Sequence, residues 1–279
     1  MKNGALSTTL IAFFLLGCLR VTPALTFSSN FESVKIEANP GQVISRHFRL
    51  VLTQDDNKTF FKARTEDWWR SEDGKQSFYR EPGSPGAPSR SCAKWVKLNP
   101  MEMGVEPGGT LDVRLSVSVP NDVKPGGYWC VLTVDEVPDP LASSTGIGVR
   151  FNASVSVGVF VYVQPLARVA RIVRVDVLPD HASIKIRNEG NTPLGVEGRF
   201  EFIRPGQKEP TASVIITRDT VLPEPINTIV CTSKLPDATV LPSGRYLVRA
   251  ILDIGLDHYI GVQKEMEVRR EVATTSTNK

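Results

Sequence analysis

One stretch of the sequence, Ile147–Val163, constrains the fold more than any other. All of its odd-numbered positions are apolar and most of them are valine, whereas the even-numbered positions up to Gly158 are polar or glycine. A period of two over this length predicts one long β-strand with one buried face. At about 3.3 Å per residue the strand would span more than roughly 50 Å, which is long for a single strand. We therefore expect it to bend at Gly158 or to serve more than one sheet.

The alternating stretch has two interpretations. In the first, it is the last core strand of an antiparallel sandwich. In the second, it is an edge strand that presents its apolar row to another protein, and the partner-binding residues are then Val155, Val157, Val159 and Val161. An exposed apolar edge also pairs readily with a second copy of the chain, so the second interpretation predicts self-association.

The rest of the sequence contains further short strands separated by turn signals. With 279 residues, of which 41% are hydrophobic and 23% charged, the chain is long enough for two folded domains. About seven strands precede Pro165 and about seven follow it. This predicts an all-β protein with two immunoglobulin-like β-sandwich domains in tandem, residues 25–165 and 166–268, and a disordered tail at 269–279. The Gly-, Pro- and Ser-rich segment Ser71–Ser91 is predicted to be a loop.

Residues 1–24 have the features of a targeting segment. Lys2 supplies the positive start and Leu6–Leu16 the apolar centre, which is too short to span a bilayer. Thr22-Pro23-Ala24 suits cleavage by signal peptidase, which is the exit that we favour. The alternative is lipidation at Cys18, because Leu15-Leu16-Gly17-Cys18 resembles a bacterial lipobox. Either way we expect an exported protein, periplasmic or at the cell surface, with a membrane anchor only if Cys18 is lipidated.

The charge balance excludes one class of partner. The chain has 33 Lys and Arg against 30 Asp and Glu, and the leader contains Lys2 and Arg20 but no acid. Removal of the leader leaves 31 basic against 30 acidic side chains, a net charge of +1. A nearly neutral chain gives no electrostatic basis for binding nucleic acid.

Three cysteines remain beyond the leader, which is an odd number for an oxidising compartment. Cys92 and Cys130 lie in the first half and are candidates for a disulfide, which would leave Cys231 as a lone thiol. The alternative is that all three are buried and inert. The sequence leaves both interpretations open.

Motifs for catalysis and metal binding are missing from the sequence. The three histidines, His47, His181 and His258, are far apart and have no Cys or His at metal-ligand spacing. There is no nucleophile elbow, phosphate loop or dinucleotide fingerprint. We therefore expect no cofactor, no metal site and no enzymatic activity.

The middle of the first half carries a more specific pattern. Residues 94–120 read KWVKLNPMEMGVEPGGTLDVRLSVSVP, and residues 125–140 read PGGYWCVLTVDEVPDP. This order resembles the first domain of periplasmic pilus (fimbrial) chaperones. In that family a short strand ending in proline, a Pro-Gly turn and an Arg-bearing strand precede a Tyr-Trp strand and a proline stop. Here Pro100, Pro107-Gly108, Arg114, Tyr128-Trp129 and Pro138 occupy those places.

The resemblance implies a mechanism. The long strand that runs into Pro165 is similar to the family's subunit-binding strand, which completes the incomplete sandwich of a pilus subunit by β-strand pairing. In the family two basic residues grip the carboxylate at the subunit's C-terminus. Lys35 is the candidate on the first strand, and Arg150 is the only basic residue on the long strand. The partners implied are extracytoplasmic β-rich subunits.

A second resemblance leads to another class of function. Surface proteins that bind WxL-domain partners also begin with a chaperone-like sandwich followed by another, and they usually end in a membrane helix and a basic tail, which this sequence lacks. On this interpretation the chain is a stationary adhesion or scaffold module. We favour a chaperone that assists assembly of pilus-like or other β-rich surface subunits.

Overall fold

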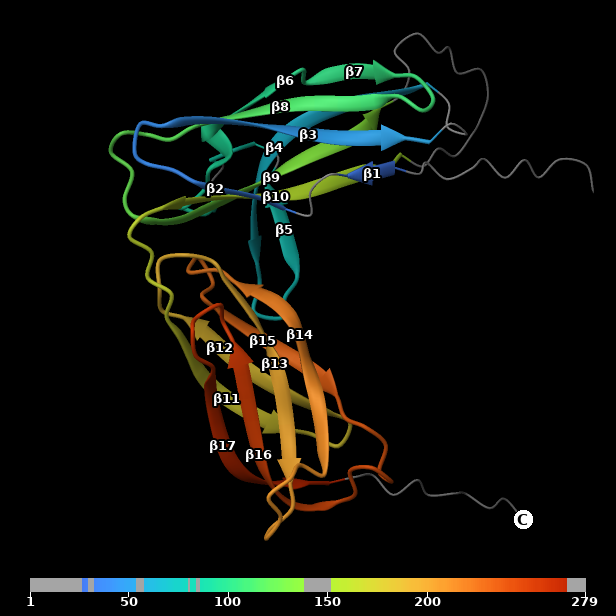
Figure 1. Ribbon diagram of the computed structural model, residues 1–279, viewed down its shortest axis with the longest axis vertical. Helices are drawn as coiled ribbons and strands as arrows, with labels where there is room; N and C mark the ends of the chain where they lie inside the picture. The colour runs from blue at the N-terminus through green and yellow to red at the C-terminus, as the bar shows by residue number, and fades with distance from the viewer. Residues whose placement is uncertain are drawn as a thin grey trace, which may run out of the picture.

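The computed structural model describes residues 27–29, 33–53, 58–79, 81–83, 86–137 and 152–269. The leader with Cys18, the candidate anchor Arg150 and the tail from residue 270 onward lie outside the described residues. The described chain forms two β-sandwiches, one above the other in Figure 1. No helix in the described part of the chain is long and apolar enough to cross a membrane.

The first sandwich packs two sheets face to face. One sheet has the order β1-β3-β8-β6 and the other has the order β2-β10-β9-β4-β5, with β7 paired to β4. A short 3-10 helix, Ala93–Trp95, precedes β6. The strands are β1 (Phe27–Ser29), β2 (Ser33–Glu37), β3 (Val43–Leu52), β4 (Thr59–Arg70), β5 (Gln76–Tyr79), β6 (Val96–Asn99), β7 (Glu102–Val105), β8 (Thr110–Ser118), β9 (Gly126–Val137) and β10 (Ser154–Val163).

The second sandwich pairs a three-stranded sheet, β11-β12-β15, with a four-stranded sheet, β14-β13-β16-β17. Together with the two sheets of the first sandwich, they confirm the predicted fold class, two immunoglobulin-like sandwiches in tandem. The strands are β11 (Ala170–Val177), β12 (His181–Asn188), β13 (Leu194–Ile203), β14 (Ala212–Val221), β15 (Thr228–Lys234), β16 (Gly244–Asp253) and β17 (Ile260–Val268).

Each sandwich has its own core, because alternate side chains of every inner strand turn toward the facing sheet. In the first, Phe48 of β3 and Leu115 of β8 pack in one cluster with Val159 of β10. In the second, Ile184 of β12 and Phe200 of β13 belong to a separate cluster. The structure thus buries two apolar centres joined by a short linker.

The cysteines follow the first of the two interpretations. Cys92 and Cys130 form a disulfide in the first core, with their Cα atoms 5.3 Å apart. Cys231 is a buried free thiol in the second core, and burial raises its pKa. A thiol with a raised pKa is less often a thiolate, so its reactivity is low.

The prediction of a loop over Ser71–Ser91 is wrong in part. Gln76–Tyr79 forms β5, which pairs with the last residues of β4 in the register Asp67↔Tyr79 to Arg70↔Gln76. The tight turn Ser71–Lys75 joins the two strands, and Gly74 adopts a φ of 82° there. Both faces of this hairpin lie outside the first core. Its sequence therefore lacks the apolar–polar alternation that marks a half-buried strand, and the hairpin was not predicted.

Candidate functional site

The long strand β10 is an interior strand over most of its length. From Gly158 to Tyr162 it lies between β2, which runs parallel to it, and β9, which is antiparallel. Val157, Val159 and Val161 are only 3%, 0% and 0% exposed. The prediction that these three side chains are exposed and available to a partner is wrong. They point into the first core, where the sheet that contains β3 and β8 covers them.

The first half of β10 is different. Ser154–Val157 pairs with β9, but on the other side of the strand no described residue pairs with it, since the pairing with β2 begins at Gly158. Val155, the fourth predicted partner-binding residue, is partly buried at the margin of the core. The Ser154 hydroxyl donates to Asp135 at 2.7 Å, which holds this segment against β9. The prediction of an edge strand therefore applies only to Ser154–Val157, which pairs with β9 and with no other described strand.

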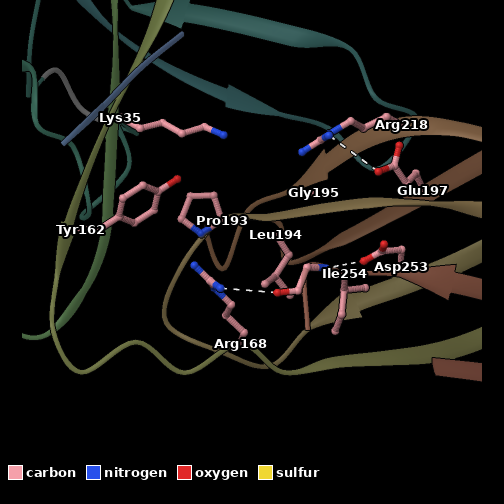
Figure 2. Close-up of a pocket in the computed structure, with 11 residues that line it drawn as sticks. Lys35, Tyr162, Arg168, Pro193, Leu194, Gly195, Glu197, Arg218, Asp253 and Ile254 are labelled. Carbon is pink, nitrogen blue, oxygen red and sulfur yellow. Dashed lines mark hydrogen bonds and ion pairs between the residues drawn. The ribbon is translucent and has the colours of Figure 1, made fainter. Parts of the chain in front are cut away.

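A cleft of about 380 Å³ opens where the two sandwiches meet, beside the end of β10. Figure 2 shows its side chains, which come from both sandwiches and from the linker. Lys35 of β2 and Tyr162 of β10 lie on one side and Arg218 of β14 on the other, while Arg168 comes from the linker. Segments far apart in the sequence thus place three cations around one space.

The cleft has a small excess of positive charge, because Lys35, Arg168 and Arg218 outnumber the carboxylates of Glu197 and Asp253. Lys35 has no ion-pair or hydrogen-bond partner among the described residues. Arg168 donates to the backbone carbonyl of Gly255 at 3.5 Å, and Arg218 lies 3.7 Å from a carboxylate oxygen of Glu197. Lys35 and Arg168 therefore keep N–H donors available for a ligand, and an anion such as a carboxylate can accept from them.

Tyr162 adds a neutral donor to the cleft. Burial raises the pKa of its phenol, and the opposing effect of the nearby Arg168 cation is smaller. The phenol stays protonated at neutral pH and can donate a hydrogen bond to an anion. Across the described residues no group of three or more His, Cys, Asp or Glu side chains is placed to hold a metal ion.

The structure brings one of the two predicted anchor residues into this cleft, Lys35. Arg150 lies outside the described residues. The sequence analysis missed Tyr162, Arg168 and Arg218. Arg168 follows the predicted hinge at Pro165 by three residues, which is a signal that could have indicated it. Arg218 could not be found from the sequence, because only the packing of the two sandwiches brings β14 to β2.

Solved structures with a similar fold include fimbrial chaperones. The chaperone in a complex with the tip adhesin of CFA/I fimbriae matches 86% of this chain and 98% of its own, with 14% identity and a TM-score of 0.50. This chain has the pilus-chaperone fold. The class 5 fimbrial chaperone CfaA and the Pseudomonas aeruginosa chaperone CupB2 also match, with 15% and 13% identity and TM-scores of 0.49 and 0.44. They cover 86% and 87% of this chain and are themselves covered over 99% and 100% of their length.

Among the comparisons with known proteins, only the solved structures match this chain. No protein-family model matches the chain, and no curated protein sequence matches it. A TM-score of 0.50 at 14% identity supports the shared architecture of two tandem sandwiches, and the shared architecture leaves the chemistry to be argued from this chain's own residues.

Proposed function

We propose that this protein is an assembly chaperone that binds β-rich, extracytoplasmic protein subunits by β-strand pairing. The observation that carries the proposal is the unpaired Lys35 in a cationic cleft at the end of β10. An extended strand of the subunit pairs with the edge of Ser154–Val157 that no described residue covers (the open edge), and the subunit's C-terminal carboxylate binds in the cleft. Lys35 is the anchor for that carboxylate, with Tyr162 and Arg168 beside it.

The two parts of this site are close enough for one ligand. Lys35 lies beside Phe160 in the register of β2 and β10. Phe160 is four positions along the strand from Ser156 in the open segment, a distance of about 13 Å. Backbone hydrogen bonds at the open edge supply affinity for any extended strand, and the carboxylate fixes the position of the chain end.

The proposed location follows from the leader and from the need for such a chaperone outside the cytoplasm. We propose that residues 1–24 direct export to the periplasm or cell surface. The adhesion or scaffold function, self-association and lipidation at Cys18 stay predictions.

The carboxylate anchor can be tested with a synthetic peptide of alternating apolar and polar residues, prepared with either a free C-terminal carboxylate or an amide. We expect the free acid to bind more tightly. Lys35→Ala should weaken binding of the acid by roughly tenfold to a hundredfold, because a hydrogen bond to a charged group contributes about 1.5–3 kcal/mol. Titration calorimetry measures both affinities.

Lys97→Ala is the matched control, because Lys97 is an exposed lysine on β6 in the opposite sheet. It should leave both affinities unchanged. Equal binding of acid and amide by the unmodified protein, or an unchanged acid affinity in Lys35→Ala, would remove the carboxylate anchor. If neither peptide binds, the strand-pairing function is contradicted as well.

A further inference from the structure

A two-stranded ribbon projects from the first sandwich toward the second. β4 pairs with β9 only as far as Glu66↔Val131, and from Asp67 onward its partner is β5. In Figure 1 this ribbon reaches the second sandwich near β14 and β15. An isolated two-stranded hairpin is only marginally stable in water, so contacts at its tip must hold it in place.

The tip of the ribbon binds both sheets of the second sandwich. Arg70 forms an ion pair with Asp219 of β14, and its guanidinium also donates to the Gly74 carbonyl at 2.9 Å. The Glu72 carboxylate accepts from Lys185 Nζ of β12 at 2.5 Å and from the Thr228 hydroxyl of β15 at 2.6 Å. These contacts join three strands of the second sandwich to one turn of the first.

A backbone contact and the root of the ribbon add to this junction. The Val230 N–H of β15 donates to the Glu72 carbonyl at 2.8 Å. Closer to the first sandwich, Leu222 at the end of β14 is buried against Trp68 and Trp129. The neighbouring Glu224 accepts hydrogen bonds from the Ser89 hydroxyl at 2.5 Å and from the Arg90 N–H at 2.8 Å. Contacts along this length oppose rotation of one sandwich about the linker.

The ribbon is connected to the cleft through β14. Arg218 lines the cleft while Asp219, next to it in the chain, pairs with Arg70, and both lie where the pairing of β14 with β13 is irregular, between Ile216 and Asp219. Figure 2 shows Lys35 and Arg218 extending toward each other from the two sandwiches. The separation of these two cations depends on how the sandwiches are held.

We propose that the ribbon Asp67–Tyr79 is a strut between the two sandwiches, and that Arg70 and Glu72 are positioning residues that hold Arg218 opposite Lys35. The cleft is then formed before any ligand binds. The strut stands on the contacts above, whereas its effect on ligand binding rests on the proposed function. A preformed site binds more tightly because the binding-competent arrangement is already populated.

The test measures the distance between the sandwiches by pulsed double electron–electron resonance. Spin labels are attached at Ser118→Cys on β8 and Lys264→Cys on β17, two exposed positions, in a Cys231→Ala background. The double variant Arg70→Ala/Glu72→Ala should broaden the distance distribution. Lys75→Ala is the matched control, because Lys75 pairs with Asp73 within the same turn and should leave the distribution narrow.

The second measurement is the affinity for the free-acid and amide peptides. If Arg70 and Glu72 position the cleft, the double variant should lose about tenfold of its preference for the acid while the amide affinity stays the same. A general loss of structure would lower both affinities instead. The milder variant Glu72→Ala should show a smaller change in the same direction.

An unchanged distance distribution in the double variant would overturn the strut. A broadened distribution with the acid preference intact, or with both affinities lowered equally, would overturn the positioning role. If the unmodified protein itself shows no preference for the acid, the proposed carboxylate anchor fails, and the distances alone then decide whether the ribbon is a strut.

Discussion

At the scale of single residues, the contact between the sandwiches depends on a close approach at Gly127. A Cβ atom at this position would lie 2.5 Å from both Pro193 Cδ and Thr192 Oγ1, so only glycine fits. The Gly127 N–H donates to the Asn191 carbonyl at 2.8 Å, and Asn191 also donates to the linker carbonyl of Pro165 at 3.2 Å. Thr192 in the same loop is 1% exposed, and its hydroxyl has no hydrogen-bond partner among the described residues.

Thr192→Val should therefore leave the free energy of unfolding unchanged or raise it by about 1 kcal/mol, because it replaces an unsatisfied buried hydroxyl with a methyl group of similar size. Chemical denaturation followed by tryptophan fluorescence measures the change. Asn191→Ala is the comparison, and it should lower the free energy of unfolding by about 1 kcal/mol or more, since it removes side-chain hydrogen bonds. A large loss of stability in Thr192→Val would mean that the hydroxyl has a partner.

At the scale of elements, β10 combines two roles along one strand. Its second half, from Gly158, is held between β2 and β9 and contributes to the core. Its first half has a described neighbour on one side only. The odd-numbered positions are apolar in both halves, because this pattern reports which side chains point inward and carries no information on which strand edges are paired.

A charged substitution on the inward face of β10 tests its role in the core separately from its role as an edge. Val157→Asp should lower the free energy of unfolding by several kcal/mol, since Val157 is 3% exposed and a carboxylate cannot be buried there without a partner. The matched substitution Val51→Asp on β3, where the valine is 43% exposed, should cost less than about 1 kcal/mol. Thermal unfolding monitored by circular dichroism compares the two variants. A folded Val157→Asp variant with an unchanged melting temperature would contradict this placement of the strand.

At the scale of the whole molecule, two sandwiches with separate cores act as one body if the ribbon and the linker both hold them. The ion pair of Arg70 and Asp219 is partly buried, with side-chain exposures of 18% and 24%. Such a pair loses more when one partner is removed than a fully exposed pair does. The Glu72 contact is more exposed, so it should respond to solution conditions first.

The Glu72 contact predicts a dependence on pH. Hydrogen bonds from Lys185 and Thr228 lower the pKa of Glu72 below its ordinary value of 4.5, and the charges of Lys185 and Arg174 act in the same direction. A carboxyl whose pKa is lowered in the docked state stabilises that state above its ordinary pKa and loses this effect as the pH falls through the lowered value. The distance distribution between the spin labels should therefore be narrow at neutral pH and broaden in acid.

Glu72→Gln is the control for this assignment, because a glutamine cannot ionise but keeps the size of the side chain. We expect the distribution of Glu72→Gln to be broader than that of the unmodified protein at neutral pH and to change less on acidification. If both proteins broaden equally and over the same range of pH, another group in the interface is responsible.

The strands of both sandwiches were predictable because each buries one face, and this leaves a period of two in the sequence. About seven strands were predicted after Pro165, and the structure has seven there, β11 to β17. The ribbon of β4 and β5 was missed because its side chains meet a second domain instead of the core of their own sandwich. Lys35 was found through a family resemblance, whereas no pattern in the sequence indicated Arg218, which reaches β2 only through the packing of the two sandwiches.

The sequence by itself determined that this chain forms two β-sandwiches, since alternation of apolar and polar residues is a local property of each strand. It also supplied the two cysteines that pair and the lysine that lines the cleft. Only the tertiary structure decided which strand edges are covered, which face of β10 is closed, and that Lys35, Arg168 and Arg218 surround one space. These features depend on contacts between residues far apart in the sequence, such as Lys35 and Phe160, and such contacts arise from the packing of whole sheets.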